Sequence, residues 1–195
     1  QKLQDVAEFV GIFGPTHEKL PPEQLMAKYR VVLAAAQRYV SQLPPAMFNE
    51  RVIPNRDRPI RLLTHHMFRI AESFIEAWNG AEYTVQFANI PPGDDVKTPQ
   101  DVVKYAEGVR AMLDAWWNAL SADERKLTKP LSTFFGVQPA HELFERSTWH
   151  SAQHCRQMME VLRTRCSVEP DRPLTADDLA GLPDRKSTRL NSSHT

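Results

Sequence analysis

The sequence STWHSAQHCRQMMEVL, residues 147–162, has the apolar spacing of a buried helix but carries two histidines, His150 and His154, four positions apart. At about 100° per residue, Leu143 and Val161 lie on one apolar stripe of this helix, and both histidines fall at its centre. A buried imidazole needs a hydrogen-bonding partner, and two protonated imidazoles side by side would repel each other. The pair therefore either binds something together, such as a metal ion, or consists of two polar residues satisfied separately at a helix surface.

Three other segments have the same helical periodicity, and proline pairs at 21–22, 44–45 and 91–92 mark their edges. We expect helices at about 22–43, 59–79, 99–120 and 139–165. The connections between these helices are long, and none contains an alternation of apolar and polar residues strong enough to predict a sheet. The expected fold is therefore all-α, a four-helix bundle with long connecting loops.

The composition restricts the class of protein. The chain has 195 residues, 42% of them apolar, which fits one domain with a substantial core. Its 24 basic and 24 acidic side chains balance, so we expect no nucleic-acid partner, which would need a basic surface. We expect no membrane span either, because no run of about eighteen apolar residues is present. Two cysteines, Cys155 and Cys166, are too few for a disulfide framework and indicate reduced thiols in the cytoplasm.

The sequence suggests a missing natural start and an added segment at the C-terminal end. Gln1 is not a start methionine, so we expect the natural beginning to be missing. Residues 184–195, DRKSTRLNSSHT, have one apolar residue and no periodicity, and they resemble the in-frame translation of a sequencing-library adapter. We therefore predict a single domain over residues 1–183 and treat 184–195 as an artefact.

A third histidine is expected to face the same site from the second helix. In the segment 59–79, Leu63 and Phe74 belong to the apolar stripe, His66 lies about 80° from its middle, and His65 lies almost opposite it. We therefore place His66 on the inner flank of the bundle and His65 on an outer surface or against a loop. Three imidazole ligands would leave an open coordination position for water or substrate, which is typical of a catalytic metal site.

At these residues the chain resembles the DinB/YfiT-like superfamily, whose members are four-helix bundles with one histidine on the second helix and His-x-x-x-His on the last. The sequences LLTHHMFRIAE (62–72) and ERSTWHSAQHCRQMMEVL (145–162) carry the resemblance, which covers roughly residues 20–165. The resemblance implies a metal triad of His66, His150 and His154. His66 is preferred over His65 because an apolar residue follows the ligand in the family motif.

The chain also resembles the C-terminal part of proteins in which a glutaredoxin-like domain precedes a DinB-like domain. The segments that carry this resemblance are 54–77, 133–157 and 169–183. A glutaredoxin-like domain and its Cys-x-x-Cys motif are absent from the sequence, so the resemblance implies that a front domain has been lost.

The resemblance implies thiol chemistry, since relatives include thiol S-transferases and a thiol-dependent maleylpyruvate isomerase. A divalent cation with an open position can deprotonate a bound thiol at neutral pH. We therefore expect a metal-dependent transferase or isomerase that acts on a small-molecule electrophile with a thiol cosubstrate such as glutathione. Zinc is the first expectation for the ion, with nickel and iron also compatible with imidazole. The resemblance also implies a homodimer.

Two alternatives use the same three ligands. One is a non-catalytic metal-binding module for stress response whose bundle serves in dimerisation, and the other is a metal-assisted hydrolase that activates water.

Other residues near the motifs allow a functional and a structural interpretation. Cys155 follows a predicted ligand but points about 100° away, which favours a buried structural thiol. Glu145 and Arg146 could orient His150 from one turn away, although a solvated helix face is the simpler interpretation. The loop residues Arg56 and Arg58 could hold a substrate carboxylate, or form part of a charged surface. We expect Ser147 on the ligand stripe, Trp116 and Trp117 in core and rim packing, and His17 and His141 outside the site.

Overall fold

The computed structural model describes residues 18–52 and 58–183; His17, Arg56 and the adapter-like segment 184–195 lie outside this part of the chain. Four long helices form the domain: α2 (Pro22–Ser41), α3 (Ile60–Trp78), α5 (Pro99–Ala119) and α6 (Ala140–Arg165). Every one of them begins and ends within two residues of the bound expected from the sequence. The prediction of an all-α four-helix bundle is confirmed.

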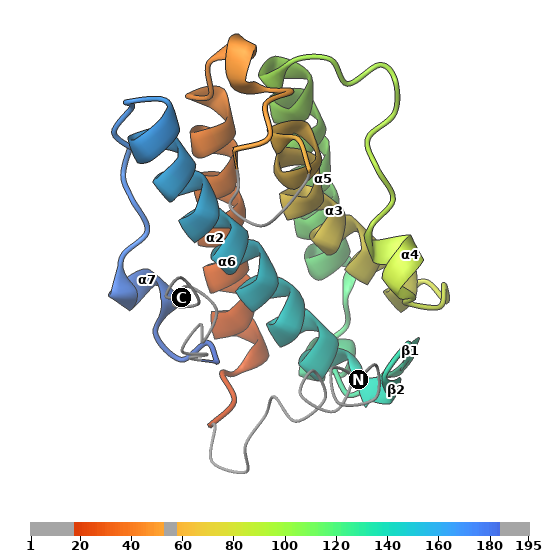
Figure 1. The fold of residues 1–195 in the computed structure, drawn as a ribbon. Coiled ribbons are helices and arrows are strands. Elements are labelled where there is room, and N and C mark those ends of the chain that lie inside the picture. Colours follow the sequence, from red (N-terminus) through yellow and green to blue (C-terminus); the bar gives the residue numbers. More distant parts are fainter. Residues whose placement is uncertain (1–17, 53–57, 184–195) are drawn as a thin grey trace, which may run out of the picture.

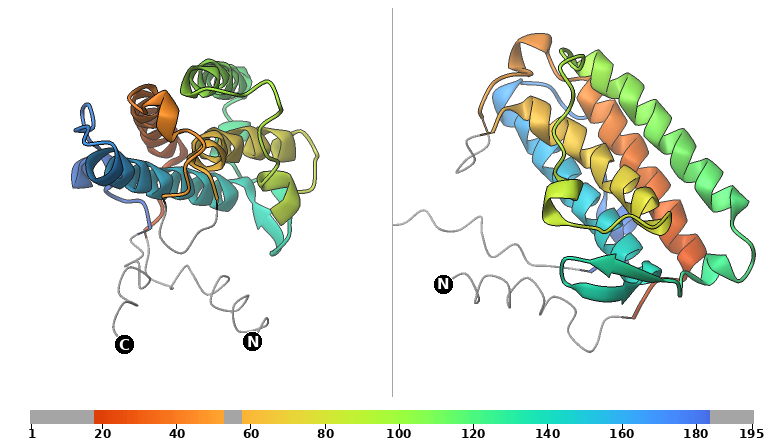
Figure 2. Two further views of the ribbon diagram at one scale, coloured as in Figure 1. Left: turned by 45° about the horizontal axis from the view of Figure 1, so that its top comes forward. Right: turned by 90° about the vertical axis from the view of Figure 1, so that its right-hand side faces the viewer.

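The four helices form a closed ring of contacts. Helices α5 and α6 each pack against both α2 and α3, so α2 and α3 occupy opposite corners of the bundle. In Figure 1, α2 and α6 run upward while α3 and α5 run downward, and Figure 2 shows all four side by side. Because α3 ends at the bottom and α5 begins at the top, the chain between them must travel the length of the bundle. This path explains the long connection, which also contains the short helix α4 (Val85–Ala88).

The helix starts follow the local sequence. Helices α2 and α5 have proline in the first turn, where its missing N–H removes no intrahelical hydrogen bond. Thr98 caps α5 through a reciprocal pair of hydrogen bonds with Asp101, a capping box. Thr175 and Asp178 repeat this arrangement at the short helix α7 (Ala176–Leu179). Single turns of 3-10 helix, η1 (Pro45–Met47) and η2 (Glu124–Lys126), follow α2 and α5.

A small hairpin replaces part of the loop expected before α6. Strands β1 (Pro130–Thr133) and β2 (Gly136–Pro139) pair antiparallel, and Tyr83 adds a parallel bridge to Thr133. The sequence contains no alternation strong enough to predict these strands, so the hairpin was not expected. Each strand has only four residues, β1 begins with Pro130 and β2 ends with Pro139, so alternation along the sequence was too short to detect. Gly136, at φ +103°, supplies the left-handed backbone that closes the hairpin turn.

The core contains one large aromatic ring from each long helix. Phe144 lies at the centre of this cluster, with its ring centroid 4.7 Å from Phe74, 5.5 Å from Trp116 and 5.4 Å from Tyr29. All four side chains are buried. Such contacts add about 0.5–1.5 kcal/mol per pair to the burial of apolar area, so they fix the spacing of all four helices at this level.

The segment after α6 returns along α2 toward α7. Tyr39 accepts a hydrogen bond from the Leu174 amide, and Lys28 donates to the backbone carbonyls of Asp177 and Asp178. Gly181, at φ +81°, passes so close to Leu20 that a Cβ on it would lie 2.5 Å from that side chain. Among the described residues, no helix is long and apolar enough to cross a membrane.

Candidate metal centre

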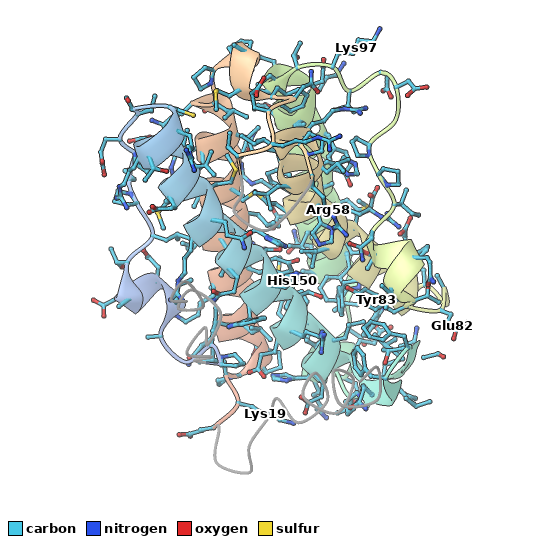
Figure 3. All side chains as sticks on the ribbon, viewed as in Figure 1. Lys19, Arg58, Glu82, Tyr83, Lys97 and His150 are labelled. Atoms are coloured by element: carbon cyan, nitrogen blue, oxygen red, sulfur yellow. The ribbon has the colours of Figure 1, made fainter. Side chains whose placement is uncertain are left out.

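Three histidines meet where α6 crosses α3. His66 comes from α3, and His150 and His154 come from successive turns of α6. The ring centroid of His66 lies 5.3 Å from that of His150 and 5.1 Å from that of His154. The centroids of His150 and His154 are 4.7 Å apart. One ring nitrogen from each histidine lies within 4.8 Å of the others. Figure 3 shows His150 on the middle turns of α6. The structure thus brings together the three residues that the sequence selected.

The backbone beside this cluster is held by a buried serine. Ser151, next to His150, donates a hydrogen bond of 3.0 Å to the carbonyl of Met67, which follows His66. The Ser151 hydroxyl also lies 3.4 Å from the hydroxyl of Tyr29 on α2. Because the bond joins residues adjacent to two of the histidines, it sets the separation of α3 and α6 at the level of the site.

The cluster fits a divalent metal ion. Imidazole nitrogens bind zinc at about 2.0–2.1 Å, and a tetrahedral arrangement would bring them to about 3.4 Å from one another. Nitrogens that already lie within 4.8 Å of one another need to approach by at most about 1.4 Å to reach this separation. His154 is buried, whereas His66 and His150 are partly exposed, so the site has an open side for a further ligand.

Two neutral hydrogen-bond acceptors orient the rings. His154 Nδ1 donates to the side-chain carbonyl of Gln157 at 2.8 Å. The ring of His66 is hydrogen-bonded to the backbone of Ala88, at the end of α4. Burial lowers the pKa of His66 to about 3, with smaller contributions from His154, His65 and Arg58. His66 is therefore neutral at physiological pH, the state in which imidazole binds a metal.

We expected His65 on an outer surface or against a loop, but it is buried against helix α5. Its ring stacks on Tyr105 of α5 with centroids 4.6 Å apart, and the residue is only 7% exposed. Burial lowers the pKa of His65 to about 4. The helical wheel located the face correctly, but it could not show that α5 covers this side of α3. His141 also lies outside the cluster, with Nε2 at 2.8 Å from the carbonyl of Leu20.

A buried arginine holds α4 against α3. Arg69, with a side chain 5% exposed, forms ion pairs with Glu72 at 2.7 Å and Glu76 at 2.6 Å. Its guanidinium also donates to the carbonyl of Phe87 and lies over the Phe87 ring. Since Ala88 follows Phe87, Arg69 is connected through one peptide unit to the backbone group that orients His66. Neither this network nor the role of Gln157 was predicted from the sequence, although a polar residue one turn after His154 was a detectable signal.

The remaining predicted residues have mixed outcomes. Cys155 is buried, donates to the carbonyl of Val32 and has a pKa raised by burial, so the structural interpretation is confirmed. Glu145 is fully buried, which contradicts a solvated helix face; the wheel gave no information on what covers this side of α6. Arg146 is partly buried, with its guanidinium 4.7 Å from the ring centre of Phe135. Arg58 is exposed, and its charge contributes to lowering the pKa of His66; Figure 3 shows it on the same side as His150.

The chain also matches a known protein family. Residues 55–158, just over half of the chain, match the DinB superfamily. The chain belongs to the DinB superfamily. All three clustered histidines lie inside the matched segment, on α3 and α6 of the DinB-like bundle. No curated protein sequence gives a significant match to the chain.

Among solved structures, the DinB-like bundle is similar to a mycothiol-dependent maleylpyruvate isomerase. The two align with a TM-score of 0.53 and 20% sequence identity, over 71% of this chain and 61% of the isomerase chain. This chain therefore spans less than two thirds of that protein, and at this identity the likeness shows a common fold. The DinB fold, with its partly exposed histidine cluster, is the framework for the functional proposal.

Proposed function

We propose that this protein is a metal-dependent enzyme whose His66, His150 and His154 hold a divalent cation that activates a low-molecular-weight thiol for transfer or isomerisation. The observation that carries the proposal is the convergence of three imidazoles, two of them partly exposed, within 4.8 Å. Membership of the DinB superfamily and the likeness to a mycothiol-dependent isomerase support the thiol as cosubstrate.

The residues of the chain have separate tasks in this proposal. A bound cation would act as a Lewis acid and lower the pKa of a thiol that occupies its open position. His66 stays neutral because it is buried, so it offers a lone pair to the cation and does not consume a proton. The bond between Ser151 and Met67 keeps the two helices at a fixed separation, which limits reorganisation when the substrate binds.

Finer assignments follow from the sequence and are part of the proposal. We propose zinc as the ion, with nickel or iron as alternatives, because imidazole suits all three. We propose glutathione as the thiol, a small-molecule electrophile as its partner, and a cytoplasmic location. A homodimer and an N-terminal glutaredoxin-like domain in the full protein rest on the resemblance alone. The domain is proposed to cover 1–183, with 184–195 as foreign sequence.

Metal analysis of purified protein tests the site. We expect about one equivalent of a divalent metal in the wild type and a loss of most of it in His154→Ala. His141→Gln is the matched control, since His141 lies on the same helix outside the cluster and should leave the metal content unchanged. Equal metal content in the wild type and His154→Ala would refute the site.

Conjugation assays with glutathione and electrophiles, with and without metal, then test the chemistry. Thiol turnover that disappears when the metal is removed would support the proposal. Full metal loading without turnover of any thiol would instead favour the binding and dimerisation module. Hydrolysis that needs no thiol would favour the metal-assisted hydrolase.

A further inference from the structure

Gln157 is the polar side chain that contacts His154 from its own helix. It lies three residues later on α6, so its side chain occupies the same face one turn further along. Its carbonyl oxygen Oε1 is 2.8 Å from His154 Nδ1, and the residue is partly exposed. The pair is formed within a single helix, so it does not depend on how neighbouring helices pack.

This contact determines which nitrogen of His154 is available to a metal. An amide oxygen only accepts hydrogen bonds, so Nδ1 must carry the proton. In a neutral imidazole, the lone pair then resides on Nε2. A hydrogen bond at the non-ligating nitrogen is the usual way in which proteins fix the tautomer and orientation of a metal-binding histidine.

The acceptor is also neutral. A carboxylate in the same place would make the imidazole a stronger electron donor and would partly compensate the charge of the cation. The second orienting group, the backbone of Ala88 on His66, is neutral as well. Arg58 adds a positive charge that His66 senses. Neither of these two groups therefore adds negative charge to a bound cation.

We propose that Gln157 is a positioning residue of the three-histidine site, which fixes the Nδ1–H tautomer of His154 and, through its uncharged amide, keeps the bound cation electron-poor. This inference rests on the proposed function, since it assigns His154 to the metal. It adds a residue outside the triad whose replacement changes metal affinity without removing a ligand.

Three variants test the inference. Gln157→Leu removes the acceptor, Gln157→Glu keeps it and adds a charge, and Gln100→Leu is the matched control for loss of an exposed glutamine elsewhere, on α5. Nitrogen NMR of the metal-free protein reports the tautomer of His154, and competition with a chelator reports zinc affinity. Thermal unfolding of each metal-free variant shows that the fold is retained.

The expected results differ for each variant. Wild type and Gln157→Glu should show the proton on Nδ1, whereas Gln157→Leu should show a mixture of tautomers. Zinc affinity should fall about 10–100-fold in Gln157→Leu, rise in Gln157→Glu and stay unchanged in Gln100→Leu. Retained or higher zinc affinity in Gln157→Glu separates a positioning role from a structural one. If Gln157 only stabilised the fold, adding a charge in its place would not restore zinc affinity.

Two results overturn the inference separately from the proposed function. A wild-type protein that binds zinc through the triad, with equal affinity in Gln157→Leu, would refute the role of Gln157 alone. A proton on Nε2 in the wild type would do the same. A wild-type protein that binds no zinc would refute the proposed function and the metal-related part of this inference together.

Discussion

Replacing Arg69 with Met tests whether one buried guanidinium holds α4 on the bundle. The Arg69 side chain is 5% exposed, and its partners Glu72 and Glu76 are 26% and 39% exposed. The hydrogen bond to the less exposed Glu72 should be worth about 1.5 kcal/mol, and the one to the Phe87 carbonyl about 1 kcal/mol. The pair with the more exposed Glu76 adds about 0.5 kcal/mol after allowance for solvent screening. Met retains most of the buried alkyl stem, so the expected loss is about 3 kcal/mol.

Chemical denaturation measures this loss, and thermal unfolding should show a decrease of about 6–12 °C for a domain of this size. Arg30→Met is the matched control, because the Arg30–Asp114 pair is 45% and 48% exposed and should contribute less than about 1 kcal/mol. Hydrogen exchange should rise at the amides of α4, whose backbone is released by the variant. A loss for Arg69→Met no larger than that of the control would refute the reasoning.

Three further predictions concern other parts of the fold. In metal-free protein the free energy of unfolding should fall as pH drops from about 6.5 toward 4. Burial lowers the pKa of His65 to about 4, so in this pH range the unfolded chain binds a proton at His65 and the folded protein does not. His65→Phe keeps a ring on Tyr105 and should reduce this fall by up to about 3 kcal/mol, as measured by denaturation at pH 7 and pH 4; parallel profiles for the two proteins would contradict the assignment. Ellman's reagent should modify the partly exposed Cys166 in native protein and Cys155 only after denaturation, and rapid reaction of both thiols would show that Cys155 is accessible. Thr98→Ala removes the capping box of α5 and should cost about 1 kcal/mol in denaturation, whereas Thr98→Ser should cost much less; equal losses would argue against the cap.

The sequence predicted those features that depend on one helix at a time. Prolines marked the helix ends, and the spacing of His150 and His154 placed both on one face of α6. It did not predict features that depend on contacts between distant segments. His65 is buried because α5 covers it, and the contact between Arg69 and Phe87 joins α3 to α4. Neither arrangement leaves a periodic signal.

The junction between the hairpin and α6 has a consequence for how the chain tolerates change. Strand β2 ends at Pro139 and α6 begins at Ala140, so no residue separates them. The first amides of α6 are hydrogen-bonded to carbonyls before the hairpin, from Ala140 to Lys129 and from His141 to Leu127. Inserting a single residue at this junction would turn the whole of α6 by about 100°, and His150 and His154 would swing away from α3. The rotational setting of a helix of 26 residues is thus determined at its first turn, which makes this short junction intolerant of insertions even though it is distant from His150 and His154.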